Sequence, residues 1–189
     1  IIVSKNGKKL IQNSLSSNNL NFELLEQNIP NGMGDAILKV INSKFYKKME
    51  NILVIWGDLP FLTKKTINTL IEEHFKNNYD FTFPTLKQKN PYTFLKKDKK
   101  GNILELIETR ELDKAIPKYG ERDIGVFIFK KKILQVLEQN LSGKRSLITK
   151  EHGFLYIIKH LISKNFLVKN LLIAQKKEAI SLNKTSDLK

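Results

Sequence analysis

Residues 52–60 read Ile-Leu-Val-Ile-Trp-Gly-Asp-Leu-Pro, an apolar run of strand length that ends at a carboxylate. A continuous apolar run suits a strand that is buried on both faces, as in a parallel sheet. Ligands of such sheets bind outside the carboxyl ends of the strands, and Asp58 follows this end. Gly57 would let a ligand approach the backbone closely. We therefore predict a metal or phosphate site at Asp58. A simpler interpretation is that Asp58 only begins a turn.

The rest of the chain alternates between short β-branched runs and segments of helical period. This alternation is typical of one α/β domain, here residues 1–189, with a Rossmann-like, mostly parallel mixed sheet flanked by helices. The expected strands are Ile1–Val3, Phe22–Glu26, Ile52–Trp56, Phe81–Thr85, Ile103–Glu108, Gly125–Phe129 and Leu167–Ala174. Apolar helix faces are expected at Ile37, Leu38, Ile41 and Phe45, at Ile67, Leu70, Ile71 and Phe75, and at Phe154, Ile158, Leu161 and Ile162.

Two local signals refine this pattern. Thr63 is a candidate N-cap for the second helix, and Asn165 a stop for the third. Residues Tyr92–Lys97 and Ile103–Glu108 predict a hairpin, because Gly101-Asn102 between them favours positive φ. The sheet should therefore carry an antiparallel excursion near its middle.

A glycine-rich turn follows the second expected strand. Asn31-Gly32-Met33-Gly34-Asp35-Ala36 opens the Ile37 helix, so that Gly32, Met33 and Gly34 could turn their amides to a nucleobase or an anion. A short Gly-x-Gly is weak evidence, and a plain strand-to-helix turn is the competing interpretation.

Three further polar residues fall at strand ends. Glu108 ends an alternating strand, and Asp123 precedes the Gly125 strand, which places acceptors for sugar hydroxyls at the rim of a cleft. Asn183 follows the last strand and could return to the same rim. Taken alone, each of these could be an ordinary solvated residue.

The charge of the chain raises nucleic-acid binding as an alternative. There are 33 Lys and Arg against 19 Asp and Glu, which gives a net charge of +14. The arginines are Arg110, Arg122 and Arg145, and the lysines are spread over nearly every segment instead of forming one stripe. A nucleic-acid-binding domain would bind with a steep dependence on salt. The dispersed lysines favour no nucleic-acid partner and suit small anionic substrates.

The residue inventory limits the remaining classes. The sequence has no Cys and three scattered His, so a metal here should be a hard, oxygen-ligated cation. No apolar run approaches the ~20 residues of a membrane-spanning helix. We expect a cytoplasmic protein without a membrane partner, and the sequence leaves its oligomeric state open.

In their order along the chain, these motifs resemble those of the sugar-phosphate nucleotidyltransferases, the pyrophosphorylase family, and most closely its N-acetylglucosamine-1-phosphate uridyltransferase domains. Gly32-Met33-Gly34-Asp35-Ala36 is similar to the family's base-contacting Gly-Thr-Gly-His-Ala. Trp56-Gly57-Asp58-Leu59-Pro60 is similar to its metal-binding Tyr-Gly-Asp-Val-Pro. The resemblance implies a nucleotide-diphospho-sugar transferase fold of GT-A-like type.

The resemblance also assigns roles to residues. Asp58 and Asn183 would hold Mg²⁺, with Asp58 as the catalytic residue, and Gly32, Met33, Gly34 and Gly57 would contact the nucleotide. The sugar would be held by Tyr92, Glu108, Asp123 and Glu151.

Three segments depart from the family's pattern. Its Gly-rich loop, Leu-x-x-Gly-x-Gly-x-Arg-Met, has no counterpart in residues 1–30, so the domain should lack its first strand and the loop that cradles the triphosphate. Pro91-Tyr92-Thr93-Phe94 replaces Gly-Tyr-Gly-Arg. Glu151-His152-Gly153-Phe154 keeps only the Glu of Glu-Tyr-Tyr-Ile.

The reaction that the resemblance implies joins a nucleoside triphosphate, UTP on the closest match, to a sugar 1-phosphate such as N-acetylglucosamine 1-phosphate, and releases pyrophosphate. Such transfers require positioning and charge neutralisation more than acid–base groups. The alternative is a noncatalytic fragment or relative that binds a nucleotide sugar, because these 189 residues lack the triphosphate loop.

Overall fold

The computed structural model describes residues 1–16, 20–112 and 117–182. The strands are β1 (Ile2–Ser4), β2 (Leu25–Gln27), β3 (Asn51–Ile55), β4 (Phe81–Lys89), β5 (Thr93–Lys97), β6 (Ile103–Glu108), β7 (Tyr119–Asp123), β8 (Val126–Lys130) and β9 (Val168–Leu172). The α-helices are α1 (Lys8–Leu15), α2 (Met33–Leu38), α3 (Lys64–Lys76), α4 (Ile133–Glu138) and α5 (Ile157–Ser163). Short 3₁₀ helices lie at Lys39–Asn42, Tyr46–Lys48, Thr109–Glu111 and Lys176–Ala179.

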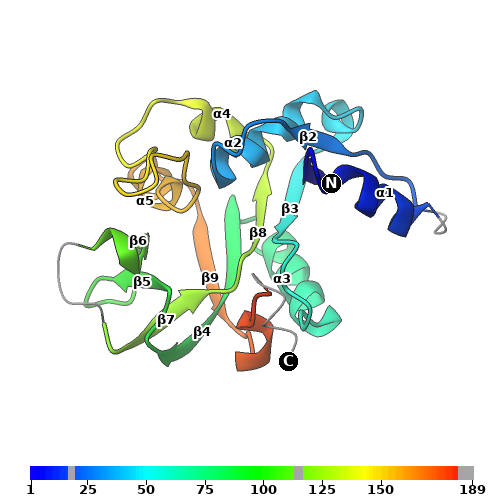
Figure 1. Ribbon diagram of the computed structural model, residues 1–189. Coiled ribbons are helices and arrows are strands. Elements are labelled where there is room, and N and C mark those ends of the chain that lie inside the picture. Colours follow the sequence, from blue (N-terminus) through cyan, green and yellow to red (C-terminus); the bar gives the residue numbers. More distant parts are fainter. Residues whose placement is uncertain (17–19, 113–116, 183–189) are drawn as a thin grey trace.

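The central sheet has the order β3-β8-β4-β7, and β9 pairs with β4. Figure 1 shows these strands in the middle of the molecule, with the β5–β6 hairpin to one side and the β1–β2 pair to the other. The expected α/β class, a mixed sheet flanked by helices, is confirmed. The expected excess of parallel pairing is wrong. Within the described residues of this sheet only β4–β9 is parallel, because β8 lies antiparallel between β3 and β4.

Strand β8 shows why the sheet is a layer between two cores. Val126 and Ile128 pack on the side of α3 with Leu70, whereas Phe127 and Phe129 pack on the side of α5. All four strand residues are buried. A strand covered on both faces needs a continuous apolar sequence, and Val-Phe-Ile-Phe provides it.

A bulge separates β7 from β8 where both pair with β4. Thr82 stands opposite Ile128, but Thr85 stands opposite Asp123, so residues 83–84 face the four residues 124–127. Gly125 lies in this bulge with a φ of +75°, a conformation that favours glycine. The bulge turns Asp123 and Gly125 towards the end of β3.

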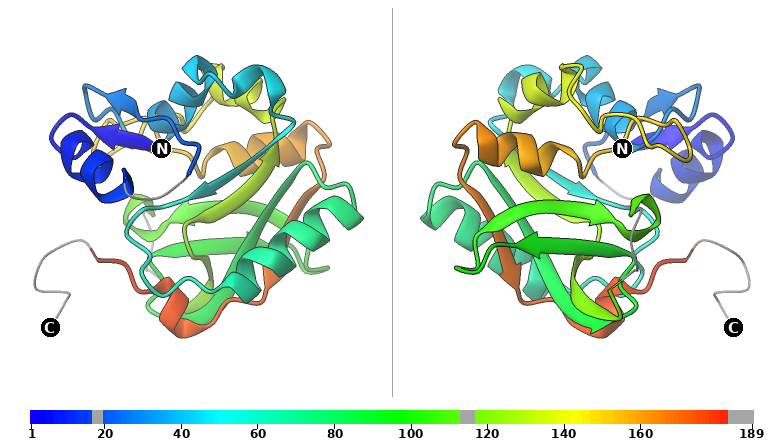
Figure 2. Two further views of the ribbon diagram at one scale, coloured as in Figure 1. Left: turned by 90° about the vertical axis from the view of Figure 1, so that its right-hand side faces the viewer. Right: turned by 90° about the vertical axis from the view of Figure 1, so that its left-hand side faces the viewer.

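The local signals are confirmed, and one helix is shorter than expected. Thr63 caps α3 by accepting a hydrogen bond from the amide of Thr66, Asn165 ends α5 with a φ of +59°, and Gly101 turns the β5–β6 hairpin with a φ of +85°. The helix expected to reach Phe45 ends at Leu38 and continues as 3₁₀ turns. Figure 2 shows this part of the chain next to α1 and the β1–β2 pair.

Candidate active site

The end of β3 is open on the side of Asp58. A methyl group added at Gly57 would meet no other heavy atom within 4 Å. Asp58 itself is half-buried, and its carbonyl accepts a hydrogen bond of 2.9 Å from the amide of Leu182. The chain after β9 therefore returns to Asp58 at Leu182. Asn183 itself lies outside the described residues.

Trp56 forms the wall beside this open end. Its amide donates to the carbonyl of Gly125 at 3.1 Å, and its indole covers the α-carbon of Gly125 so closely that a methyl group there would lie 2.7 Å from the ring. The indole Nε1 is buried and has no hydrogen-bond partner in the described structure. The bulge glycine is thus required by packing against Trp56.

Asp123 is buried beneath the site and stabilises the backbone around it. The carboxylate is 1% exposed. Thr93 Oγ1 donates to its Oδ1 at 2.5 Å, and the amide of Gly125 donates to its Oδ2 at 2.8 Å. These bonds tie the β5–β6 hairpin to the bulge. The predicted sugar contact of Asp123 has not been tested, and burial of both oxygens favours a supporting role.

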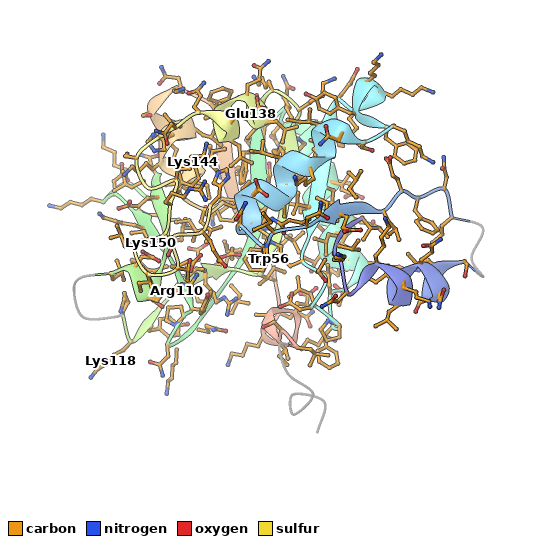
Figure 3. All side chains as sticks on the ribbon, turned by 45° about the horizontal axis from the view of Figure 1, so that its top comes forward. Trp56, Arg110, Lys118, Glu138, Lys144 and Lys150 are labelled. Carbon is orange, nitrogen blue, oxygen red and sulfur yellow. The ribbon has the colours of Figure 1, made fainter. Side chains whose placement is uncertain are left out.

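A cavity of about 180 Å³ lies next to Trp56. Its walls come from α2, β3, the β5–β6 hairpin and the loop before α5, and four predicted site residues line it: Met33, Tyr92, Glu108 and Glu151. The further lining residues are Trp56, Arg110, Ser146, Thr149, His152, Gly153, Phe154 and Leu155. The sequence patterns did not single out Arg110, Ser146, Thr149 or His152 as site residues. In Figure 3, Trp56 and Arg110 lie near each other on this side of the molecule.

The polar wall of this cavity consists of Glu108, Arg110 and Tyr92. Arg110 Nε lies 2.5 Å from Glu108 Oε2, and the guanidinium lies 6.0 Å from the centre of the Tyr92 ring. Burial raises the pKa of Tyr92, and the nearby Glu108 carboxylate adds to this effect. Tyr92 is therefore a neutral hydroxyl, and the carboxyl group of Glu108 is held in place by Arg110. Such a group suits the hydroxyls of a sugar.

The predicted nucleotide loop packs on the opposite wall. The amide of Gly34 donates to the carbonyl of His152 at 2.9 Å, and the amide of His152 donates to the carbonyl of Asn31 at 2.6 Å. A methyl group at Gly32 or Gly34 would lie 2.5 Å or 2.3 Å from a backbone carbonyl of residues 152–153. Packing thus requires both glycines, and their contact with a base remains a prediction.

His152 completes this wall as a neutral ring. Burial, together with the nearby cations Lys144 and Arg145, lowers its pKa to about 4. Its Nε2 lies 3.3 Å from the hydroxyl of Tyr156, whose pKa burial raises to about 12. Neither group can exchange a proton readily near neutral pH. His152 is a packing residue of the cavity, and a poor general base.

A larger groove of about 790 Å³ adjoins the cavity, because Met33 and Trp56 line both. It runs between β1 and β3 and ends at Gly57 and Asp58. Within the described residues β1 pairs only with β2, and β3 only with β8. Both strands therefore turn an unpaired edge to the groove. The two hollows thus share Met33 and Trp56, and Asp58 lines the larger one.

Asp58 is the one described carboxylate at this end of the groove that could take part in binding a hard cation. Among the described residues no three His, Asp or Glu side chains come together as a metal site. Mg²⁺ does not need such a cage, since it keeps several waters and is commonly held by one or two carboxylates together with substrate phosphates. Asp58, half-buried beside open space, provides one such carboxylate. The described residues include no helix that is long and apolar enough to cross a membrane.

Comparison with known proteins gives the class and then the family. The fold matches solved nucleotidyltransferases of GT-A-like type, such as a UDP-glucose pyrophosphorylase complexed with UDP-glucose (TM-score 0.67, 14% identity, covering 95% of this chain and 75% of that one). An inositol-1-phosphate CTP transferase from T. maritima matches with a TM-score of 0.68 and 14% identity, over 100% of this chain and 71% of that one. The sequence profile described as a MobA-like NTP transferase domain matches residues 1–154, so the chain belongs to that family.

Curated relatives agree with this assignment. The bifunctional protein GlmU of Buchnera aphidicola subsp. Schizaphis graminum is 27% identical over 184 residues, which are 97% of this chain and 38% of that protein. GlmU of Thermosipho africanus is 31% identical over 103 residues, 54% of this chain and 23% of that protein. The chain therefore spans well under half the length of these relatives.

Proposed function

We propose that this domain transfers a nucleoside monophosphate from a nucleoside triphosphate to a sugar 1-phosphate, with UTP and N-acetylglucosamine 1-phosphate as the first pair to test. The observation that carries the proposal is the meeting of the two hollows at Met33 and Trp56, with Asp58 in the wall of the larger one. The smaller hollow would hold the sugar, and the larger one, of about 790 Å³, would hold the nucleotide. Their junction is where two bound phosphates would come together.

In the proposed reaction a phosphate oxygen of the sugar 1-phosphate attacks the α-phosphorus of the triphosphate. A new P–O bond forms as the bond to the β-phosphate breaks, and pyrophosphate leaves without net proton transfer. The protein's role is to position the two substrates and to neutralise the charge of their phosphates. Mg²⁺, held by Asp58 and Asn183, would neutralise the reacting phosphates.

The residues of the cavity receive matching roles in this proposal. Glu108 accepts hydrogen bonds from sugar hydroxyls, Arg110 holds Glu108 in place, and Glu151 and Tyr92 complete the rim. Gly57 allows a nucleotide to approach the backbone closely, since nothing else occupies that space. Asp123 supports the hairpin that carries this wall.

The family's triphosphate-binding loop has no counterpart in residues 1–30, and we propose that a separate segment brings such a loop into the groove. The free edges of β1 and β3 support this, because a strand placed between them would find backbone partners on both sides. We also propose a cytoplasmic location, where nucleoside triphosphates are available.

The test is pyrophosphate release by the full-length protein with UTP, CTP, GTP and dTTP, each crossed with a panel of sugar 1-phosphates. We expect one preferred pair and a requirement for a divalent cation. Asp58→Ala should lower the rate by about 100-fold or more, since metal-ligand and charge-stabilising groups contribute on this scale. Release by no pair would overturn the enzyme proposal in favour of a nucleotide-sugar-binding role.

A further inference from the structure

The segment after β9 folds back against the end of β3. It begins with the 3₁₀ helix Lys176–Ala179, drawn in red at the bottom of Figure 1, and reaches Asp58 through the hydrogen bond from Leu182. Ala179 packs into the same core as Leu59 and Leu62. Two stretches that are more than a hundred residues apart in sequence therefore form one layer beside the predicted cation site.

Glu178 joins these two stretches. Its side chain is completely buried. Oε1 accepts hydrogen bonds from the amide of Thr63 at 3.0 Å and from the Thr63 hydroxyl at 2.8 Å. Oε2 accepts one from the amide of Gln175 at 2.8 Å. A buried carboxylate is tolerated only when its oxygens are satisfied in this way.

The ionised form of Glu178 is the one that these contacts hold. Burial alone would raise its pKa, but hydrogen bonds from Gln175, Thr66 and Thr63 outweigh burial and lower the pKa below its usual value. The carboxylate also lies at the first turn of α3, which Thr63 caps, and a negative charge there is favoured by the helix dipole.

The turn between β3 and α3 is thus fixed at both ends. At one end, Trp56 is bonded to Gly125 in the neighbouring strand. At the other end, Thr63 is bonded to Glu178. Asp58 lies between these two anchors, and its own carbonyl is bonded to Leu182. Removing Glu178 would release the turn and the returning segment together.

We propose that Glu178 is a positioning residue for the cation site. It holds the turn that carries Asp58 against the returning segment up to Leu182, so that the Asp58 side chain stays in place for a divalent cation. This inference rests on the proposed function, since it assigns a role only if Asp58 binds a cation.

The test compares Glu178→Ala with Asp80→Ala in the full-length protein. Asp80 is a matched control, because it is also a buried carboxylate, accepts a backbone amide from Leu167 at 2.9 Å and pairs with Lys130 and Lys132. It precedes β4 at the end of the sheet opposite Asp58, since Phe81 pairs with Phe129 while Ile55 pairs with Val126.

Two readouts do not depend on turnover. The first is Mn²⁺ binding in the presence of UTP, followed by electron paramagnetic resonance. Glu178→Ala should weaken it by about tenfold or more, a usual effect for groups that orient metal ligands. The second is hydrogen exchange of the Leu182 amide, which should lose its protection. Asp80→Ala should change neither.

Glu178→Gln tests the same point with a smaller perturbation. It keeps an acceptor for Thr63 but turns an amide N–H towards the N–H of Gln175, so it should bind Mn²⁺ with intermediate affinity, and it replaces the alanine variant if that variant does not fold. Wild-type binding in folded variants of Glu178, or equal weakening in Asp80→Ala, overturns the inference. Absence of Mn²⁺ binding in the wild-type protein instead overturns the proposed cation site itself.

Discussion

At the scale of single residues, the site combines polar groups of opposite character within one cavity. Glu108 forms an ion pair with Arg110, whereas His152 is kept neutral by its surroundings. The difference follows from burial and neighbours. Glu108 has a cation within 2.5 Å, but His152 is enclosed and has cationic neighbours in Lys144 and Arg145. The cavity therefore offers charge for recognition on one wall and a dry packing surface on the other.

The enclosed imidazole predicts a pH dependence of stability. A free histidine has a pKa near 6.5, and that of His152 is about 4. Between these values the unfolded chain takes up a proton that the folded chain does not, so stability falls as the pH drops through this window. The loss from this residue is complete below pH of about 4.

The variant to test is His152→Gln, which removes the contribution of His152 to the pH dependence of stability. Urea midpoints measured by circular dichroism at pH 7 and at pH 4.5 should fall further for the wild-type protein than for the variant. His160→Gln serves as a control, because His160 is only half-buried and bonds to the Ser142 carbonyl. Equal falls in the wild type and in His152→Gln would contradict the prediction.

At the scale of elements, two loops with glycines have different physical reasons for them. Gly34 lies where α2 meets the backbone of residues 152–153, and an added methyl group would come within 2.3 Å of a carbonyl. Gly57 faces open space at the end of β3. The first glycine serves packing. The second has no such packing reason and is free for the nucleotide contact that we propose.

The variants Gly34→Ala and Gly57→Ala distinguish a glycine required for packing from a glycine required for binding. Gly34→Ala should lower the free energy of unfolding by about 1–3 kcal/mol, the usual cost of overpacking, because a backbone carbonyl cannot swing away as a side chain can. Gly57→Ala should change it by less than about 0.5 kcal/mol but weaken UTP binding. Urea unfolding and calorimetric titration measure the two effects. A stability loss in Gly57→Ala, or none in Gly34→Ala, would contradict this account.

The elements that the sequence predicted best have apolar runs. β3, β4, β6 and β8 were all expected, since each contains a run or alternation that only a strand can bury. β7 was missed because Tyr119–Asp123 is polar. Its Glu121 is nevertheless buried, with hydrogen bonds to Thr85 and Asn170. A strand held by a polar network has no hydrophobic period to reveal it.

Some residues of the candidate site could be predicted from the sequence, and others could not. Asp58, Glu108 and Met33 were found because their motifs follow strands in a fixed order. The loop that carries Ser146 and Glu151 reaches the 3₁₀ helix after β6, because the Ser146 hydroxyl and the amide of Leu147 donate hydrogen bonds to Glu111. Such a contact depends on tertiary folding. Glu151 was therefore predicted only through the family resemblance, and its neighbours Ser146, Thr149 and His152 were not predicted.

At the scale of the whole molecule, the high net charge is distributed instead of concentrated. Lysines pair with acidic residues in separate regions, at Lys8–Glu26, Lys96–Glu105, Lys97–Glu121 and Lys130–Asp80. A nucleic-acid interface gathers its cations along one face. The scattered pairs agree with small phosphorylated substrates, for which a general positive field speeds encounter without a dedicated surface.

The unpaired strand edges along the groove have a consequence for how the protein self-associates. Unpaired strand edges are templates for other chains, and on β3 the exposed side chains of Leu53 and Ile55 make this edge apolar. We expect residues 1–189 alone to self-associate as their concentration rises, as seen by analytical ultracentrifugation. Leu53→Lys should keep them monomeric, whereas Phe75→Lys, at an exposed apolar residue on α3, should not. The groove that would receive a nucleotide would then also be the origin of aggregation as long as the edges of β1 and β3 stay unpaired.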